Sequence, residues 1–184
     1  MHFKVVIPAR YESTRFPGKL LSTINGRTII SHVIDLAKKS GAEEVIVATD
    51  DQRIAESVAT SDCHVIMTRK THASGTDRIA EVALRQNWSP ETLVVNVQGD
   101  EPFIPPALIN SVAQTLWDTP DASASTACFP VSDREDLFNP NLVKVVLNYQ
   151  NYALYFSRAP IPWSRDTFSD EHNNLPHDYP GFGH

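Results

Sequence analysis

The chain has 184 residues, of which 41% are hydrophobic and 21% are charged. These values exclude a collagen-like chain, a low-complexity tail and a small disulfide-bonded scaffold, and they favour a compact globular fold with a sizeable core. The net charge of −6 excludes a general attraction to nucleic acid or to anionic lipid. Any polyanionic ligand must therefore be bound by a local group of cations.

The sequence also indicates where the protein works. No uncharged run of about 18 apolar residues is present that could cross a bilayer, and residues 1–10 lack the pattern of a secretory signal. Cys63 and Cys128, the only cysteines, do not form a CxxC pair, which favours two reduced thiols over a disulfide or a thiolate metal site. We therefore expect a cytoplasmic protein with no membrane partner and no nucleic-acid partner.

The first two thirds of the chain alternate short apolar runs with segments of helical period. Continuous apolar runs predict strands that are buried on both faces, and they span residues 5–7, 45–48, 65–67 and 93–97. Between them, apolar residues recur at spacings of three and four, which predicts helices around residues 29–37, 54–58 and 79–83. This order predicts an α/β fold with a mostly parallel, doubly wound sheet.

Beyond residue 104 the pattern changes. Pro105-Pro106 can start a helix that contains Leu116, because proline is tolerated in the first turn of a helix. Residues 123–131 look extended, and the runs 143–147 and 152–156 flank a polar connection, which predicts an added antiparallel hairpin. We assign residues 1–166 to one α/β domain and expect residues 167–184, which show no period, to be irregular or disordered.

A basic loop follows the first predicted strand, and open α/β sheets bind ligands at the carboxyl ends of their strands. The segment PARYESTRFPGK holds Arg10, Arg15 and Lys19, with Glu12 as its only acid. Two guanidinium forks and one ammonium group can surround a triphosphate, and Gly18 lets the backbone come close. The segment is neither a GxxxxGK[ST] phosphate loop nor a GxGxxG dinucleotide motif. A solvated basic loop would have the same composition.

An acidic motif, QGDEP, follows the fourth predicted strand. Asp100 would stand at the carboxyl end of that strand, where a carboxylate can hold Mg²⁺ beside phosphates. A turn with surface acids is the alternative interpretation. Because the basic loop is expected at the same edge of the sheet, the two motifs together favour the metal site.

The segment HASGTDR leads into the third predicted helix. Ser74 or Thr76 can cap this helix, and Gly75 leaves room for a flat ring or a ribose against the backbone. A plain helix cap without a ligand is the alternative. Arg158 follows the predicted hairpin and can meet an acidic substrate, although a surface salt bridge would explain it equally well.

Several motifs together carry a resemblance to a known enzyme family. They are PARYESTRFPGK, INGRTII, VIVATDD, HASGTDRIAEV, VNVQGDEP, FNPNLVKVVL and YALYFSRAPIPW. In order and spacing, over residues 3–166, they resemble the 3-deoxy-manno-octulosonate cytidylyltransferase family, whose members join CTP to the sugar acid Kdo. The resemblance implies a nucleotide-diphospho-sugar transferase-like fold, Mg²⁺ as cofactor, a homodimer, and formation of CMP-Kdo and pyrophosphate for lipopolysaccharide synthesis.

By position, the resemblance also implies roles for individual residues. These are Arg10, Arg15 and Lys19 for the CTP phosphates; Ser74, Gly75 and Arg78 for the cytidine side; Gln98 and Arg158 for the sugar acid; and Asp100 for Mg²⁺. The chemistry implied is attack of the anomeric hydroxyl on the α-phosphorus, with pyrophosphate as leaving group. Alignment and charge neutralisation would then carry catalysis, without a covalent nucleophile.

One departure from the family pattern concerns the end of the chain. The family continues into a GIYGYR-like segment and then into an aspartate-bearing segment that supplies a second metal carboxylate. Residues 175–184 match only the first of these, and only loosely, and the second has no counterpart in these 184 residues. We therefore expect the 184-residue form to be impaired in turnover. Two alternatives stay open: a cytidylyltransferase for sialic acid or another sugar acid, and a remnant that binds CTP without turning it over.

Overall fold

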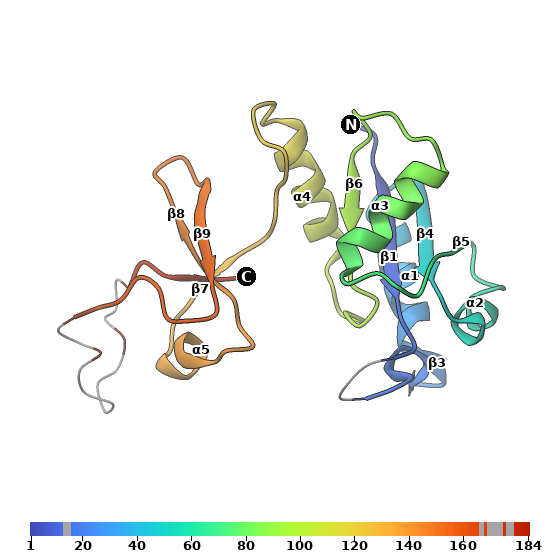
Figure 1. Cartoon of the computed structure of the whole chain (residues 1–184), viewed down its shortest axis with the longest axis horizontal. Helices are drawn as coiled ribbons and strands as arrows, with labels where there is room; N and C mark the ends of the chain where they lie inside the picture. The colour runs from blue at the N-terminus through green and yellow to red at the C-terminus, as the bar shows by residue number, and fades with distance from the viewer. Residues whose placement is uncertain (13–15, 166–167, 169–174, 176–178) are drawn as a thin grey trace. The chain divides into compact units, whose positions relative to one another are not determined.

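The structure is a computed structural model that describes residues 1–12, 16–165, 168, 175 and 179–184. The chain forms two compact units, Met1–Ser125 and Thr126–His184, which Figure 1 draws from blue to yellow and from yellow to red. This division falls well before residue 166, where the sequence predicts a boundary. Each unit has its own sheet.

The first unit is built on a parallel sheet with the strand order β5-β4-β1-β6. The strands are β1 (Lys4–Ala9), β4 (Glu44–Thr49), β5 (His64–Met67) and β6 (Val94–Asn96). β1 pairs in parallel with β4 on one side and with β6 on the other, and β4 pairs in parallel with β5. Apolar residues occupy successive positions of β1 and β4 because both faces of these central strands are covered.

Helices cover both faces of this sheet. They are α1 (Ile29–Lys38), α2 (Gln52–Ser57), α3 (Gly75–Arg85) and α4 (Pro106–Trp117). Ile34 of α1, Ile54 of α2 and Ile109 of α4 belong to one apolar cluster with Val5 of β1. Val82 of α3 belongs to a second cluster on the opposite face, and Figure 1 shows α3 in front of the strands. The predicted doubly wound α/β fold is therefore confirmed.

The strand order reverses between β1 and β6, and the crevice is defined as the place outside the carboxyl ends of these two strands. The chain runs outward from β1 through β4 to β5 and then returns to the other side of β1 for β6. Ligands of open α/β sheets bind at such a reversal, outside the carboxyl ends of the two strands. The loops that follow β1 and β6 are the ones that carry the basic and the acidic motifs.

Three short elements of the first unit were not predicted from the sequence. They are the 3₁₀ turn η1 (Lys19–Leu21) and the strands β2 (Thr23–Ile24) and β3 (Arg27–Thr28), which pair antiparallel. Asn25 and Gly26, between these two strands, both have positive φ angles, of 52° and 78°. An Asn-Gly pair is the usual signal of such a tight hairpin, so the sequence contained the information.

The second unit contains an antiparallel sheet with the order β7-β10-β8-β9. Its elements are β7 (Phe129–Pro130), α5 (Arg134–Phe138), β8 (Lys144–Leu147), β9 (Ala153–Ser157) and β10 (Phe182–Gly183). β8 and β9 form the predicted hairpin, closed by a hydrogen bond of 2.9 Å from the Asn148 N–H to the Tyr152 carbonyl.

Two expectations for this unit need correction. Of residues 123–131, expected to be extended, only Phe129–Pro130 form a strand. Phe182–Gly183, in the segment expected to be irregular, form β10 between β7 and β8. A Cβ at Gly183 would lie 2.8 Å from the ring of Phe129, so a larger residue there would require that ring to shift. Residues 166–167, 169–174 and 176–178 lie outside the described residues.

Candidate active site

The loops after β1 and β6 meet at the crevice between these strands. Lys19 lies in η1, and Asp100 lies four residues after the last residue of β6. The Nζ of Lys19 donates a hydrogen bond of 2.7 Å to Oδ2 of Asp100. The structure thus brings together the cation and the carboxylate that the sequence assigned to phosphate and to metal.

This ion pair is open to solvent. The side chains of Lys19 and Asp100 keep 43% and 46% of their surface exposed. Ion pairs at such exposure are worth roughly 0–1 kcal/mol, because water screens them and both side chains lose freedom. A ligand that offers a phosphate to Lys19 and a cation to Asp100 can therefore separate the pair at little cost.

The basic loop is closed at its base by Tyr11. The Gly18 N–H donates a 2.8 Å hydrogen bond to the Tyr11 carbonyl, and Gly18 has a φ of 72°. The guanidinium of Arg53, from α2, lies 3.2 Å from the centroid of the Tyr11 ring. Arg53 also donates hydrogen bonds of 2.9 and 2.6 Å to the Asp51 carboxylate and so lowers the pKa of that carboxyl. Tyr11 and Arg53 were not among the residues predicted for the site, and their contacts fix the base of the loop.

The other two cations of the loop are Arg10 and Arg15. Arg10 directly follows β1 and is partly exposed. Within the described part of the chain its guanidinium forms no ion pair, so it remains available to an anion. Arg15 lies outside the described residues.

The start of α3 lies against the same crevice. A Cβ at Gly75 would be 3.1 Å from Cγ of Pro8 in β1 and 3.7 Å from Nε2 of Gln98. A Cβ at Gly99 would be 3.3 Å from the Pro8 carbonyl oxygen. Gly75 therefore allows the start of α3 to pack closely on Pro8 of β1. Gln98 is exposed at this edge and donates a 2.9 Å hydrogen bond to Asn96.

Ser74 caps α3, as one of the two alternatives for this segment predicts. Its Oγ accepts a hydrogen bond of 3.1 Å from the Asp77 N–H, and the Asp77 carboxylate accepts one of 3.0 Å from the Ser74 N–H. This capping box satisfies two backbone donors that a helix start would otherwise leave open. Ser74 is thus held in place next to Gly75.

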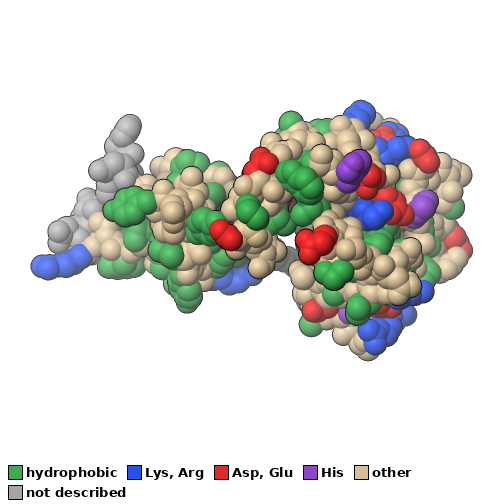
Figure 2. Space-filling view, turned by 90° about the horizontal axis from the view of Figure 1, so that it is seen from above, with side chains coloured by type: hydrophobic (Ala, Val, Ile, Leu, Met, Phe, Trp, Pro, Cys, Tyr) green, Lys and Arg blue, Asp and Glu red, His purple; other side chains and the backbone are tan. Residues whose placement is uncertain are grey.

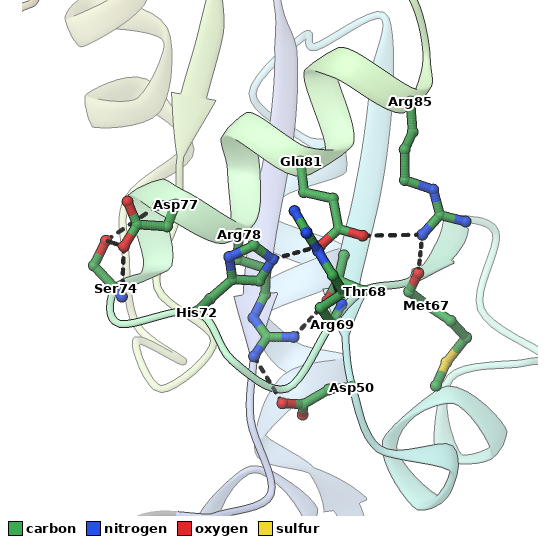
Figure 3. A network of polar contacts seen from close by, with 10 residues as sticks. All are labelled: Asp50, Met67, Thr68, Arg69, His72, Ser74, Asp77, Arg78, Glu81 and Arg85. Atoms are coloured by element: carbon green, nitrogen blue, oxygen red, sulfur yellow. Dashed lines mark hydrogen bonds and ion pairs between the residues drawn. The ribbon is translucent and has the colours of Figure 1, made fainter.

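The structure places Arg78 differently from the expected position on the cytidine side. Its side chain is completely buried. Its guanidinium forms an ion pair of 2.8 Å with Asp50, which follows β4, and donates a hydrogen bond to Thr68, which follows β5 (Figure 3). With no exposed surface, Arg78 ties together the ends of two strands. The helical period contained this signal, because Arg78 stands four residues before the buried Val82 on the same face of α3.

Arg158 lies in the second unit, directly after β9, and is exposed. Its guanidinium donates a hydrogen bond of 2.7 Å to the Pro140 carbonyl. Lys144 of β8 is buried and donates to the carbonyls of Asn139 and Leu142 in the same loop. Burial, with a smaller contribution from the charge of Arg158, lowers the pKa of Lys144.

Two features are absent from the residues that the structure describes. In that part of the chain, no group of three or more His, Cys, Asp and Glu side chains is arranged to hold a metal ion. Among the helices of the same residues, none has the length and apolarity needed to cross a membrane.

The chain is similar to known cytidylyltransferases. A family model described as cytidylyltransferase matches residues 4–178. The 3-deoxy-manno-octulosonate cytidylyltransferase of Nitrosococcus oceani is 50% identical over 174 residues, which cover 95% of this chain and 67% of that protein. The protein of the same name from Hahella chejuensis is 52% identical over 182 residues, covering 99% of this chain and 71% of its relative.

A solved structure shows the same fold. CMP:2-keto-3-deoxy-manno-octonic acid synthetase complexed with CTP has a TM-score of 0.83 and 39% identity, over 100% of this chain and 74% of that chain. The family model matches most of the chain. The two relatives are 50% and 52% identical to it, over 95% and 99% of its length. The chain therefore belongs to the 3-deoxy-manno-octulosonate cytidylyltransferase family.

Proposed function

We propose that this protein transfers CMP from CTP to Kdo. The anomeric hydroxyl of Kdo attacks the α-phosphorus, a new C–O–P linkage forms, and the bond between the α- and β-phosphates breaks. Pyrophosphate leaves with the electron pair of that bond, and the hydroxyl proton passes to solvent. The products are CMP-Kdo and pyrophosphate.

The observation that carries this proposal is the meeting of Lys19 and Asp100 at the crevice between β1 and β6. Phosphoryl and nucleotidyl transfer need cations that neutralise the phosphates and a scaffold that aligns them, with little covalent chemistry from the protein. Lys19, together with Arg10 and Arg15, would bind the CTP phosphates from the loop after β1. The identity of 50% to proteins named for this activity supports the choice of CTP and Kdo.

Mg²⁺ is part of the proposal. Asp100 offers hard carboxylate oxygens on a side chain that is 46% exposed, which fits an ion that prefers one or two carboxylates and keeps several waters. Bound Mg²⁺ would neutralise phosphate charge. Release of Asp100 to the ion would free the Lys19 ammonium group to donate to a phosphate oxygen.

Other residues would bind and orient the two substrates. Ser74 and Gly75, fixed at the start of α3, would lie on the cytidine side. Gln98, exposed beside Gly75, would contact the sugar acid. Arg158 would bind the carboxylate of Kdo, since a guanidinium fork matches that group. For Arg78, its complete burial supports a positioning role in place of a direct contact.

We also propose a homodimer in the cytoplasm that serves lipopolysaccharide synthesis. The second unit exposes large apolar side chains, among them Tyr149, Leu154, Tyr155 and Trp163. Figure 2 shows hydrophobic side chains on the visible face of this unit, which lies at the left of the view. Exposed apolar surface of this kind supports a protein interface.

The test measures binding and turnover separately. Calorimetry with CTP reports whether the chain binds the nucleotide, and a pyrophosphate-release assay with CTP, Mg²⁺ and Kdo reports whether it turns it over. N-acetylneuraminate in place of Kdo tests the sialic-acid alternative. Binding together with Kdo-dependent release of pyrophosphate is the expected result. Binding without release would identify a CTP-binding protein, and absence of CTP binding would overturn the proposal.

A further inference from the structure

The loop between β5 and α3, residues 68–74, is held by the helix that follows it. This loop ends at Ser74, the cap of α3, beside Gly75 on Pro8 of β1. Figure 3 shows the loop running below α3, with polar side chains of the helix directed toward it. A shift of the loop would therefore move the start of α3 at the crevice.

Glu81 is the centre of these contacts. Its Oε2 accepts a hydrogen bond of 3.0 Å from the Arg69 N–H, and the ring Nε2 of His72 contacts the same oxygen. Its other oxygen, Oε1, lies 3.4 Å from a guanidinium nitrogen of Arg85, one helical turn further along. One carboxylate of α3 thus holds the loop at two positions, residues 69 and 72.

Further contacts between α3 and the loop lie on either side of Glu81. Arg85 donates to the Met67 carbonyl, at the end of β5, and Arg78 donates to Thr68 at the first residue of the loop. The capping box of Ser74 and Asp77 holds the last residue. The helix therefore contacts the loop at its beginning, its middle and its end, as Figure 3 shows.

The contact between His72 and Glu81, in the middle of the loop, is buried. Glu81 is 8% exposed, and the side chain of His72 is 9% exposed. The hydrogen bond from His72, followed by that from the Arg69 N–H, lowers the pKa of Glu81 to about 2. The carboxylate is therefore ionised at neutral pH and can only accept hydrogen bonds, so Nε2 of His72 carries the proton between them. Substitution of His72 would remove a hydrogen-bond donor from the buried Glu81 carboxylate.

We propose that His72 and Glu81 are positioning residues for the nucleotide: they touch no ligand, and they hold residues 68–74 so that Ser74 and Gly75 stand at the crevice. This inference rests on the proposed function, in which Ser74 and Gly75 face the cytidine. It adds two residues that no part of the sequence analysis assigned to the site.

The test compares CTP affinity in three variants. His72→Leu replaces the donor to Glu81 with an apolar side chain of similar size, and His72→Gln keeps an N–H donor. His64→Leu is the matched control, because His64 also contacts a glutamate, Glu44, at 2.6 Å, but stands at the first residue of β5 and is 73% exposed. Circular dichroism and melting temperature monitor the fold of each variant.

At metal sites, residues that hold a ligating residue without touching the metal provide a comparison. Their substitution typically costs tenfold to a hundredfold in affinity or activity. We therefore expect His72→Leu to raise the Kd for CTP about tenfold, His72→Gln to restore most of the loss, and His64→Leu to leave the Kd unchanged. A purely structural role would lower the melting temperature of folded His72→Leu without changing its Kd. That outcome, or equal losses in His72→Leu and His72→Gln, would overturn the inference.

Two further arms keep the result decisive. If His72→Leu does not fold, Arg85→Met loosens the same network from its exposed end, since the Arg85 side chain is 52% exposed. An unchanged Kd in folded Arg85→Met would then refute the positioning role. The unmutated chain is measured first, because a failure of that chain to bind CTP is a failure of the proposed function and is distinct from a failure of this inference.

Discussion

Lys19 and Asp100 neutralise each other at the crevice between β1 and β6, across a distance of 2.7 Å and a separation of 81 positions in the sequence. Because each charge satisfies the other, the two residues should act in opposite directions on a ligand that carries negative charge. Opposite effects of the two substitutions on CTP binding would therefore distinguish a phosphate site from an ordinary surface salt bridge.

Lys19→Ala should weaken CTP binding. Loss of one charged hydrogen-bond partner of a phosphate costs roughly 1.5–3 kcal/mol, which is about tenfold to a hundredfold in Kd. Calorimetry in the absence of metal measures this directly. Lys38→Ala is the control, because Lys38 forms an equally short pair with Asp62 at the end of α1. Equal affinities for CTP in the Lys19 and Lys38 variants would place the phosphates elsewhere.

Asp100→Asn should leave CTP binding without metal unchanged or stronger. The substitution removes a negative charge and releases Lys19, so the nucleotide meets less repulsion. In the presence of Mg²⁺ the same variant should lose the metal-dependent gain in affinity and any turnover, while its melting temperature changes little. Near-normal pyrophosphate release at saturating CTP and Kdo would contradict the metal assignment of Asp100.

Arg78→Met should destabilise the fold by about 3 kcal/mol. Arg78 has no exposed surface, and the Asp50 side chain is only 14% exposed, so removal of one partner leaves a largely buried charge. Denaturant unfolding followed by circular dichroism gives the free energy. The double variant Arg78→Met/Asp50→Asn should recover part of the loss, because no buried charge then remains unpaired. A double variant as unstable as the sum of both single variants would show that the ion pair is not the cause.

Glu81 should contribute to the dependence of stability on acidity. Its pKa is lowered from 4.5 to about 2 in the folded chain, so below pH 4.5 the unfolded state binds the proton first. The stabilisation from Glu81 is fully present above pH 4.5 and is lost as the pH falls toward 2. Glu81→Gln should therefore be less stable than the unmutated chain at pH 6, and the difference should shrink at pH 3. Urea unfolding at both pH values measures this, with Glu91→Gln, an exposed position after α3, as control.

Gly18→Ala should disturb the basic loop by more than the strain of a left-handed backbone conformation. Gly18 and Gly26 both have positive φ, of 72° and 78°. A Cβ at Gly18 would lie 3.1 Å from the Tyr11 ring, which Arg53 holds from α2, whereas a Cβ at Gly26 meets nothing within 4 Å. Backbone strain of roughly 1–2 kcal/mol is common to both.

The matched pair of alanine variants separates the two effects. Gly26→Ala should lower stability by the backbone strain alone and keep the Kd for CTP. Gly18→Ala should lower stability further and weaken CTP binding, since the Tyr11 contact closes the loop that carries Lys19. Thermal unfolding and CTP calorimetry on both variants provide the comparison, and identical behaviour would rule out a role for Tyr11 in holding the loop.

Local patterns were enough to predict most of the first unit. The strands β1, β4, β5 and β6 and the helices α1 to α4 follow from apolar periods that lie within single segments. The right-handed crossover rule fixes the hand of their connections but not the order of the strands. β10 could not be predicted, because Phe182–Gly183 pair with β7 and β8, elements that lie far away in sequence. A two-residue strand has no period of its own and exists only through its partners.

The sequence by itself determined the residue types at the crevice and the loops that carry them. Lys19 and Asp100 follow strands whose carboxyl ends must share one edge of a parallel sheet, so their neighbourhood was predictable. Only the tertiary structure decided which polar residues face a ligand and which face the protein. Arg78 and Glu81 lie one turn apart on α3, and both are residue types that usually lie at the surface. Both are buried here because Asp50, His72 and the Arg69 N–H approach them from other elements. The helical period places Arg78 on the same face of α3 as the buried Val82, but it does not identify the partner of a buried charge, because that partner is defined by distance in space.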